Sequence, residues 1–274
     1  MTTPKPPRIL SIAGSDSSGG AGVQADIKTI TMLGGYAMTA ITAITAQNTV
    51  GVQGIAPTAG GMVAAQIASC IDDIGLDAIK IGMLHDAAVI AEVAGALERV
   101  TAPIVLDPVM IATSGAALIE PAAVAALRDM LFPRAALITP NLPELEHLVG
   151  RTLAGTEDMV AAAEELSAAC GAAVLAKGGH GEGDRIVDVL YFPATDTRGA
   201  RAVAYDHARI DTVHTHGTGC TLSSAIATLL GHGQPIEHAV RLGRQFVVKA
   251  IEAAPGYGAG HGPLGHQAVR ASQS

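Results

Sequence analysis

The run from His214 to Thr221 combines residue types that bind phosphate with a cysteine that could react. Its sequence is His-Thr-His-Gly-Thr-Gly-Cys-Thr, and a long apolar segment follows, which predicts a glycine-rich turn at the start of a helix. Backbone N–H groups at a helix N-terminus lack partners inside the helix and lie at the positive end of its dipole, so they can bind a polyphosphate. Gly217 and Gly219 allow the backbone to approach such a ligand closely. We expect the pKa of Cys220 to lie below the usual value of about 8.5 here.

A second glycine-rich segment, from Gly14 to Asp26, follows the first predicted strand. It does not fit a P-loop, because Ala21 stands after Gly20 where that motif needs Lys. Residues 20–25 match G-x-G-x-x-A, but the ribose-binding acidic residue expected about 20 positions later is missing. We therefore interpret the segment as a tight strand-to-helix turn. From these residues alone, a turn over a substrate and a purely structural turn remain equal alternatives.

Composition limits the classes of partner. Acidic residues outnumber basic ones by 25 to 17, and aromatic residues make up only 3% of the 274 residues. Nucleic-acid surfaces need basic patches and stacking platforms, so we expect no nucleic acid and instead small-molecule partners. No run of about 20 apolar residues is present, so no membrane span is expected. The proline-rich residues 1–8 are interpreted as a disordered lead-in rather than a signal peptide.

The three cysteines argue against a disulfide framework or a zinc site. Cys70, Cys170 and Cys220 are far apart, odd in number and without C-x-x-C spacing. A reducing cytoplasm fits this usage best. We expect Cys70 and Cys170 to be inert apolar side chains.

Short β-rich runs alternate with alanine-rich amphipathic stretches along the chain. The predicted strands are Arg8–Ala13, Ala37–Ala46, Ala78–Ile81, Pro103–Leu106, Ala135–Thr139 and Ala172–Ala176. The predicted helices are Gly22–Leu33, Gly60–Ile74, Asp86–Arg99, Pro121–Leu131 and Thr156–Cys170. This alternation predicts a parallel sheet between helical layers, with ligand sites at the carboxyl ends of the strands. Later segments predict an antiparallel edge pair and two long helices, at Arg185–Phe192, Ala200–Tyr205, Thr218–Gly231 and Pro235–Ala253.

A series of short motifs recurs in a fixed order along the chain. They are IAGSD (12–16), GGAGVQAD (19–26), AQNT (46–49), KIGML (80–84), LDPVM (106–110), TPNLPE (139–144), KGGH (177–180) and HTHGTGCT (214–221). In this order and spacing they resemble, over nearly the whole chain, the hydroxymethylpyrimidine and phosphomethylpyrimidine kinases of thiamin biosynthesis, within the ribokinase-like superfamily.

The resemblance implies both a fold and an activity. The fold would be a single ribokinase-like domain over residues 9–274, a three-layer αβα sandwich with a mainly parallel sheet and an antiparallel edge. The activity would be phosphorylation of 4-amino-5-hydroxymethyl-2-methylpyrimidine, and then of its monophosphate, by ATP with Mg²⁺. The family resemblance also implies a homodimer.

For the acceptor side, the resemblance assigns Gln47, Asp26, Gly14 and Met83 to the pyrimidine. Chemistry supports Gln47, because a carboxamide matches the amino group and ring nitrogen of an aminopyrimidine with its own C=O and NH₂. Without the resemblance, a Gln that bonds backbone or water is the more common case. Asp26 could equally stabilise the start of the first helix. Met83 could be ordinary core.

For the nucleotide side, the resemblance points to Asn141, Glu144, Lys177 and Thr218. Glu144 follows a predicted strand and can hold Mg²⁺ directly or through water, although it could also be only an acidic residue in the first turn of a helix. Lys177, at another strand end, can neutralise charge on the transferred phosphoryl group. Asp107, at a third strand end, is a secondary candidate for the metal.

Cys220 carries the mechanistic hypothesis. Many members of the wider superfamily have Asp at this position as the base toward the acceptor hydroxyl, whereas the pyrimidine kinases resemble this chain in having Cys. The thiol would accept the hydroxymethyl proton while the amides of residues 217–220, including Gly217, Thr218 and Gly219, hold the phosphoryl group. Because the second acceptor is already an ionised phosphate, loss of the thiol should slow the first phosphorylation more than the second.

Two other functions remain as alternatives. One is a pyridoxal kinase of the same superfamily, against which Gln47 argues. The other is a non-catalytic binding protein on the same fold, against which the retention of Glu144, Lys177 and Cys220 together argues. His214 and His216 are interpreted as structural, because no third metal ligand lies nearby in the sequence. The glycine-rich tail, residues 256–266, either closes over the nucleotide or forms an exposed loop.

Overall fold

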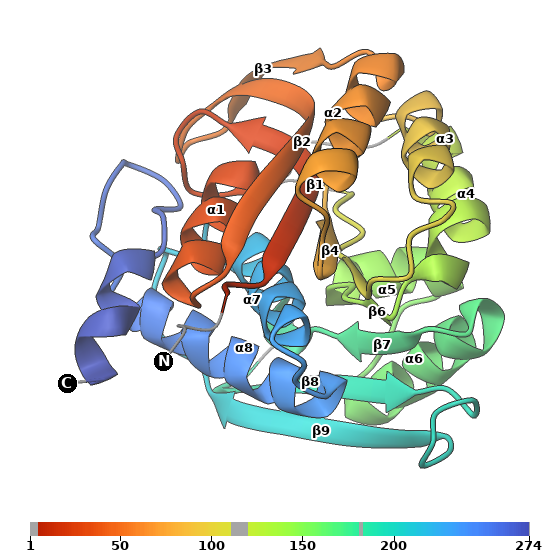
Figure 1. The fold of residues 1–274 in the computed structure, drawn as a ribbon. Helices are drawn as coiled ribbons and strands as arrows, with labels where there is room; N and C mark the ends of the chain where they lie inside the picture. Colours follow the sequence, from red (N-terminus) through yellow and green to blue (C-terminus); the bar gives the residue numbers. More distant parts are fainter. Residues whose placement is uncertain (1–4, 111–119, 181–182, 274) are drawn as a thin grey trace.

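One sheet runs through the molecule in the computed structural model, which describes residues 5–110, 120–180 and 183–273 (Figure 1). Among these residues the strand order is β3-β2-β1-β4-β5-β6-β7-β8-β9. Neighbouring strands are parallel from β2 to β7, while β3, β8 and β9 each pair antiparallel. The strands are β1 Arg8–Asp16, β2 Tyr36–Gln47, β3 Val52–Pro57, β4 Ala78–Ile81, β5 Ile104–Leu106, β6 Leu137–Ile138, β7 Ala173–Ala176, β8 Arg185–Phe192 and β9 Arg201–Ala208.

Helices cover both faces of the sheet (Figure 1). Helices α1, α7 and α8 pack together on one face, and α2 to α6 cover the other. The helices are α1 Gly22–Met32, α2 Gly60–Asp73, α3 Ala87–Ala96, α4 Pro121–Ala126, α5 Leu142–Val149, α6 Thr156–Cys170, α7 Thr218–Gly231 and α8 Ile236–Glu252. A π-helical turn at Leu127–Leu131 continues α4, and short 3₁₀ segments occur at Phe132–Arg134, Gly178–His180 and His266–Gln273.

The core is divided by the sheet into two apolar layers. Successive residues of a strand point to opposite faces, so Ile9 packs with α7 and α8 while Leu10 packs with the other helical layer. The inner strands β4, β5 and β7 are buried on both faces, which explains why they are nearly all apolar. The predicted three-layer sandwich with a mainly parallel sheet and an antiparallel β8–β9 edge is therefore confirmed.

The opposite edge was not predicted. Strand β3 (Val52–Pro57) pairs antiparallel with β2, and most of its residues are exposed. The sequence of β3 does not alternate between apolar and polar residues, because neither face of the strand is well buried. The segment also contains Gly54 and ends in Pro57, and it is held by backbone hydrogen bonds to β2. The predicted lead-in overlaps residues 1–4, which lie outside the described residues.

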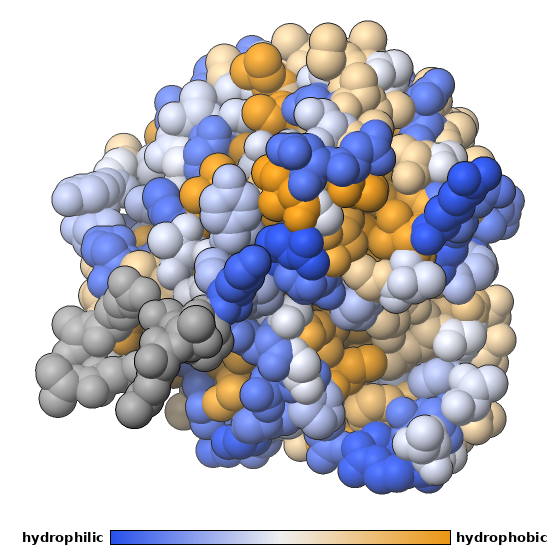
Figure 2. All heavy atoms as spheres, viewed as in Figure 1, coloured by the Kyte–Doolittle hydropathy of each residue, from blue (hydrophilic) through white to orange (hydrophobic). Residues whose placement is uncertain are grey.

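Among the described residues, no helix combines the length and the apolar composition needed to cross a membrane. Hydrophilic and hydrophobic residues are interspersed over the face of the molecule seen in Figure 2. Exposed apolar side chains among polar neighbours are normal on protein surfaces, so this face by itself identifies no docking surface.

The parallel strands bring distant segments to one edge of the sheet. Asp16 and Gln47 stand at the ends of β1 and β2, and Asp107 and Lys177 directly follow β5 and β7. The start of α7 lies at the same edge, because Gly217 contacts the loop after β1 and Gly219 lies beside Asp107 and Lys177. This is the edge at which α/β sheets bind ligands.

Candidate active site

The glycine-rich turn before α7 has the predicted geometry. Gly217 is the residue before the helix and has φ of +86°, a left-handed conformation that favours glycine. A side chain here would collide with the carbonyl oxygen of Gly20 in the loop after β1. No side chain caps this end of α7, and Thr218 and Gly219 begin the helix. The Thr218 N–H donates to the Thr215 carbonyl at 3.3 Å, so the amides of Gly219 and Cys220 are the better candidates for donors to a ligand or water.

An ion pair stands at the tip of this turn. The Lys177 ammonium lies 2.8 Å from Oδ1 of Asp107, and the Thr139 hydroxyl donates to the same oxygen at 3.0 Å. A Cβ atom added to Gly219 would lie 3.4 Å from Lys177 Nζ and 3.3 Å from Asp107 Oδ2. Burial by itself lowers the pKa of Lys177, but the charges of Asp107 and Glu144 raise it by more, so the pKa lies above its ordinary value. The ammonium therefore stays charged beside the turn.

Glu144 is more enclosed than expected. It forms a capping box at the start of α5: its carboxylate accepts the Asn141 N–H at 2.8 Å, and its own N–H donates to the Asn141 side chain at 2.9 Å. Its other oxygen accepts the Met110 N–H at 3.4 Å. Burial raises the pKa of Glu144 to about 7; Lys177 opposes this rise and Asp107 adds to it. Glu144 therefore does cap the start of α5, as one of the two interpretations proposed. Its carboxylate also lies close enough to Asp107 and Lys177 for their charges to change its pKa.

These residues fit a metal that is held mainly by phosphate. Two carboxylates, Asp107 and Glu144, share one ammonium, so the cluster carries an excess of negative charge when Glu144 is ionised. In the described part of the chain, no three His, Cys, Asp or Glu side chains form a group that could hold a metal by themselves. Mg²⁺ commonly binds through one or two carboxylates plus water and substrate phosphates, which is what this cluster could offer.

The residues assigned to the pyrimidine lie at the β1–β2 end of the same edge. The backbone of Gln47 is bonded twice to Ser17, and its side-chain amide lies 3.1 Å from the Thr45 hydroxyl. A Cβ atom on Gly14 would lie 2.5 Å from the Met83 methyl group, so the Met83 side chain packs directly against the Gly14 backbone. Met83 belongs to a small apolar cluster that is separate from the two core layers. The arrangement offers one amide and an apolar wall.

Asp26 is buried and bonded to other protein groups. Its carboxylate is fully buried and accepts hydrogen bonds from Ser11 at 2.5 Å, from Ser224 at 2.6 Å and from Lys80 at 2.8 and 3.0 Å. These four bonds show that Asp26 supports the site from beneath, and its contact with the pyrimidine remains a prediction. Lys80 is likewise fully buried. The signal for it was present in the sequence, because Lys80 interrupts an otherwise apolar strand.

The expected low pKa of Cys220 is wrong. Burial raises the pKa of the thiol to about 11; the nearby Lys80 ammonium lowers it, and Asp26 and Asp107 raise it again. The sequence argument considered only the helix dipole, whereas two carboxylates and the loss of water oppose the thiolate. At neutral pH Cys220 is therefore a protonated thiol.

This protonation state gives a prediction for Cys220→Ala. We expect kcat at pH 7 to fall less than about tenfold on both acceptors, because a general base typically contributes about 10²–10⁴-fold and a thiol with a pKa of about 11 is a poor one at this pH. Between pH 6 and 9 the pH profile of kcat should have the same shape in the wild type and in Cys220→Ala. Steady-state rates on the alcohol and on its monophosphate measure this. A loss above 100-fold confined to the alcohol would restore the base role.

Both histidines before the turn and the tail lie at the pyrimidine end. The imidazole of His216 is buried against Asp16, in agreement with the structural interpretation. The tail packs on the loop after Gln47, where the His261 N–H donates to the Thr49 carbonyl at 2.9 Å. The tail therefore lies against other protein segments on the acceptor side.

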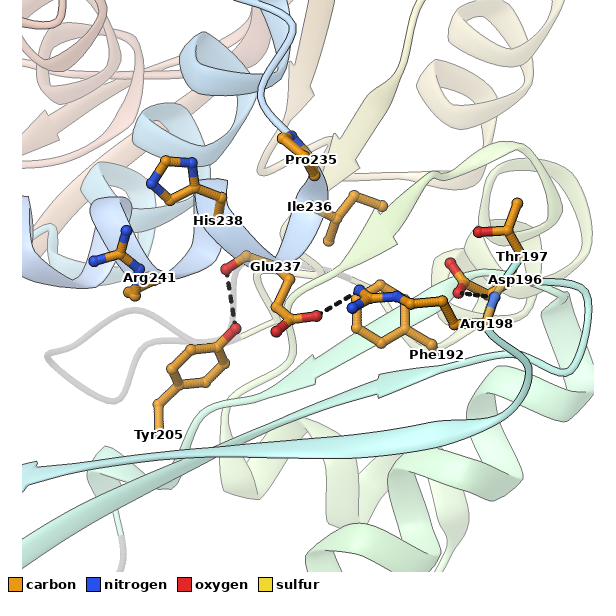
Figure 3. A pocket seen from close by; sticks show the side chains of 10 residues that line it. All are labelled: Phe192, Asp196, Thr197, Arg198, Tyr205, Pro235, Ile236, Glu237, His238 and Arg241. Atoms are coloured by element: carbon orange, nitrogen blue, oxygen red, sulfur yellow. Dashed lines mark hydrogen bonds and ion pairs between the residues drawn. The ribbon is translucent and has the colours of Figure 1, made fainter.

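A cavity lies at the end of β8 and the start of β9. This cavity of about 670 Å³ contains none of the predicted site residues and lies where α8 begins (Figure 3). Inside it, Arg198 pairs with Glu237 at 2.5 Å, and the Tyr205 hydroxyl donates to the Glu237 carbonyl at 3.0 Å. Three of its polar residues are thus bonded to one another, and the cavity lies at the end of β8 remote from Lys177. We assign the active site to the other edge of the sheet.

Comparison with known proteins agrees with this site. The profile of a family described as phosphomethylpyrimidine kinase matches residues 16–265. A hydroxymethylpyrimidine/phosphomethylpyrimidine kinase of Bacillus subtilis is 43% identical over 265 residues, covering 96% of each chain. A thiamine biosynthesis bifunctional protein of Geobacter sulfurreducens is 44% identical over 94% of this chain, which spans only 52% of that longer relative.

A solved structure gives the same result for the fold. The ADP complex of Bacillus subtilis pyridoxal kinase superimposes with a TM-score of 0.86 at 37% identity, covering 97% of this chain and 99% of that one. Both the profile and the full-length relatives extend over the strand ends and the α7 turn described above. The chain therefore belongs to the phosphomethylpyrimidine kinase family and is a kinase.

Proposed function

We propose that this kinase phosphorylates 4-amino-5-hydroxymethyl-2-methylpyrimidine with ATP, and then phosphorylates the monophosphate to the diphosphate. The observation that carries the proposal is the placement of the charged Lys177, paired with Asp107, beside Gly219 at the tip of α7. A cation next to a row of helix-end amides is suited to a phosphoryl group in transfer. The name of the full-length Bacillus subtilis relative supports the substrate.

In the proposed mechanism, the turn and Lys177 hold the phosphoryl group while the β1–β2 end holds the acceptor. The amides of residues 217–220 would bind the oxygens of the transferring group, and the Lys177 ammonium would neutralise their charge. When bound, Mg²⁺ would neutralise nucleotide phosphates, held through Glu144 and Asp107. Phosphoryl transfer through a loose transition state depends mainly on positioning, so the Cys220 thiol would pack against the acceptor and need not ionise.

Gln47 would decide between the two candidate heterocycles. Its amide stands at the end of β2 beside Thr45, and an amide can pair with the amino group and ring nitrogen of an aminopyrimidine. The pyridoxal ring lacks that amino group. Pyridoxal nevertheless remains the second candidate, because the pyridoxal kinase of Bacillus subtilis shares this fold closely.

This role gives a prediction for Gln47→Ala. We expect kcat/KM for the aminopyrimidine to fall about 10- to 100-fold, because a paired amide contributes about 1–3 kcal/mol of discrimination. The value for pyridoxal should change less than about threefold. Gln53→Ala, in the exposed strand β3, is the control because its amide contacts only the neighbouring loop. Equal losses on both substrates would show that Gln47 supports the loop instead of reading the ring.

The proposed function itself is tested by release of ADP. Purified protein with Mg²⁺ and ATP should release ADP on addition of the aminopyrimidine, first with the alcohol and then with its monophosphate. A kcat/KM for pyridoxal equal to or above that for the pyrimidine would overturn the substrate assignment. Absence of ADP with either compound would favour a binding protein. The homodimer implied by the resemblance and the cytoplasmic location inferred from the cysteine usage remain predictions.

A further inference from the structure

Two loops from opposite ends of the chain interlock beside the proposed site. The first, residues 17–21, follows β1, and the second is the turn at residues 215–217. A side chain on Gly20 would collide with the imidazole of His216, and a side chain on Gly217 would collide with the carbonyl oxygen of Gly20. The two backbones therefore meet without side chains between them, except for the His216 ring.

The His216 ring joins the two loops through Asp16. The distance from Nε2 of His216 to Oδ2 of Asp16 is 2.8 Å, and the two side chains are only 6% and 3% exposed. The same carboxylate accepts hydrogen bonds from the N–H and hydroxyl of Ser18 and from the N–H of Ala21, each at 2.8 Å. Asp16 thus fixes the whole first loop, and His216 is the group that links this loop to the turn before α7.

Charge and backbone contacts reinforce the link. Burial alone would raise the pKa of Asp16, but its hydrogen bonds from His216, Ser18 and Ala21 outweigh burial and lower it to about 2, so the carboxylate persists at neutral pH. On the side of the tail, the backbone N–H of His216 donates to the backbone carbonyl of Gly262 at 3.2 Å, and His216 forms a β-bridge with Pro263. His216 is therefore held between the first loop and the tail.

We propose that His216 and Asp16 are a positioning pair, which holds the phosphoryl-binding turn at residues 217–219 in register with the acceptor side of the site. The inference rests on the proposed function for its kinetic consequence, although the link itself is independent of substrate. Both side chains are bonded to protein groups, so this role requires no contact with the reacting atoms. The pair acts by keeping the amides of the turn and the acceptor loop at a fixed separation, and small misplacements of reacting groups slow a reaction strongly.

The kinetic test compares His216→Ala with His216→Gln. We expect His216→Ala to lower kcat about 100-fold for both phosphorylations while KM for ATP and for the pyrimidine changes less than threefold. His216→Gln should recover to within about fivefold of wild type, because its terminal amide nitrogen can replace Nε2 as donor to Asp16. Asp16→Ala added to His216→Ala should cost less than it does alone, because the shared interaction is already lost, although the bonds of Asp16 to Ser18 and Ala21 are still removed.

A matched control and a second measurement separate the possible outcomes. His232→Ala, at the other end of α7, removes an exposed imidazole that contacts the Leu33 carbonyl, and should keep wild-type kcat. Hydrogen exchange of the intact protein should speed up at least tenfold in peptides covering residues 17–21 and 215–221 of His216→Ala. Unchanged exchange in either peptide, or a loss of kcat that Gln does not restore, overturns the positioning pair. If the wild-type protein releases no ADP but His216→Ala still shows faster exchange in both peptides, only the proposed function is overturned.

Discussion

Replacing Lys80 with Met should lower the free energy of unfolding by about 3–5 kcal/mol, because it leaves the Asp26 carboxylate charged and unpaired inside the protein. Both side chains are fully buried, and they lie 2.8 Å apart. Burial lowers the pKa of Lys80, but the charge of Asp26, with further contributions from Cys220 and Asp107, raises it beyond its ordinary value. In a protein of this size the loss corresponds to a fall in Tm of roughly 10 °C. Urea unfolding and calorimetry measure both quantities.

Two further variants test the cause of this loss. Lys80→Met combined with Asp26→Leu removes both charges and should recover much of the stability, since a buried pair can often be replaced by apolar groups at little cost. Arg185→Met breaks an exposed pair with Asp206 on the β8–β9 edge and should leave the unfolding midpoint nearly unchanged. If the buried and exposed variants behaved alike, the Asp26–Lys80 pair would not be the support that the structure indicates.

Replacing Lys177 with Ala should lower kcat by about 10²–10³-fold with ATP and the pyrimidine alcohol, the effect typical of losing one preorganised electrostatic group. The ammonium lies beside Gly219 and is only partly exposed, so it would act where water is scarce. KM for the pyrimidine should change little, because the proposed acceptor residues lie at the other end of the site. Single-turnover rates separate the chemical step from product release.

Three controls separate the charge of Lys177 from the shape of its side chain and from the stability of the fold. Lys177→Arg keeps the charge but replaces a compact ammonium with a planar fork, so we expect only partial recovery of kcat. Lys249→Ala, an exposed lysine near the end of α8, should match wild type. The Tm of Lys177→Ala must be recorded, because Asp107 loses its ion-pair partner. A folded Lys177→Ala with kcat within fivefold of wild type would remove Lys177 from the mechanism.

The two lysines contribute in different ways although both are paired with aspartate. Lys80 has no exposed surface and holds β4, α1 and α7 together through Asp26 and Ser224. Lys177 keeps a partly exposed ammonium at the mouth of the site. We therefore expect the larger stability loss from Lys80 and the larger loss of kcat from Lys177.

Much of the fold could be predicted from the sequence because its signals are local. Strand Ala78–Ile81 and the helices Thr156–Cys170 and Thr218–Gly231 have the bounds that the residue pattern predicted. Each helix begins after a glycine and carries a buried apolar face, and the strand is buried on both sides. Strand β3 was not predicted because its residues are mostly exposed and therefore show no alternation of apolar and polar residues. Only its backbone pairing with β2 makes it a strand.

The sequence by itself determined that the strand-end motifs and the turn at Gly217 gather at the carboxyl edge of the sheet, because alternating strands and helices predict parallel strands whose carboxyl ends share one edge. Only the tertiary structure decided what surrounds them. Asp26 finds its partners 54 and 198 residues away, at Lys80 and Ser224. Cys220 has a raised pKa because folding removes water and brings Asp26 and Asp107 close, and such burial and charge are properties of the folded chain that no local segment encodes.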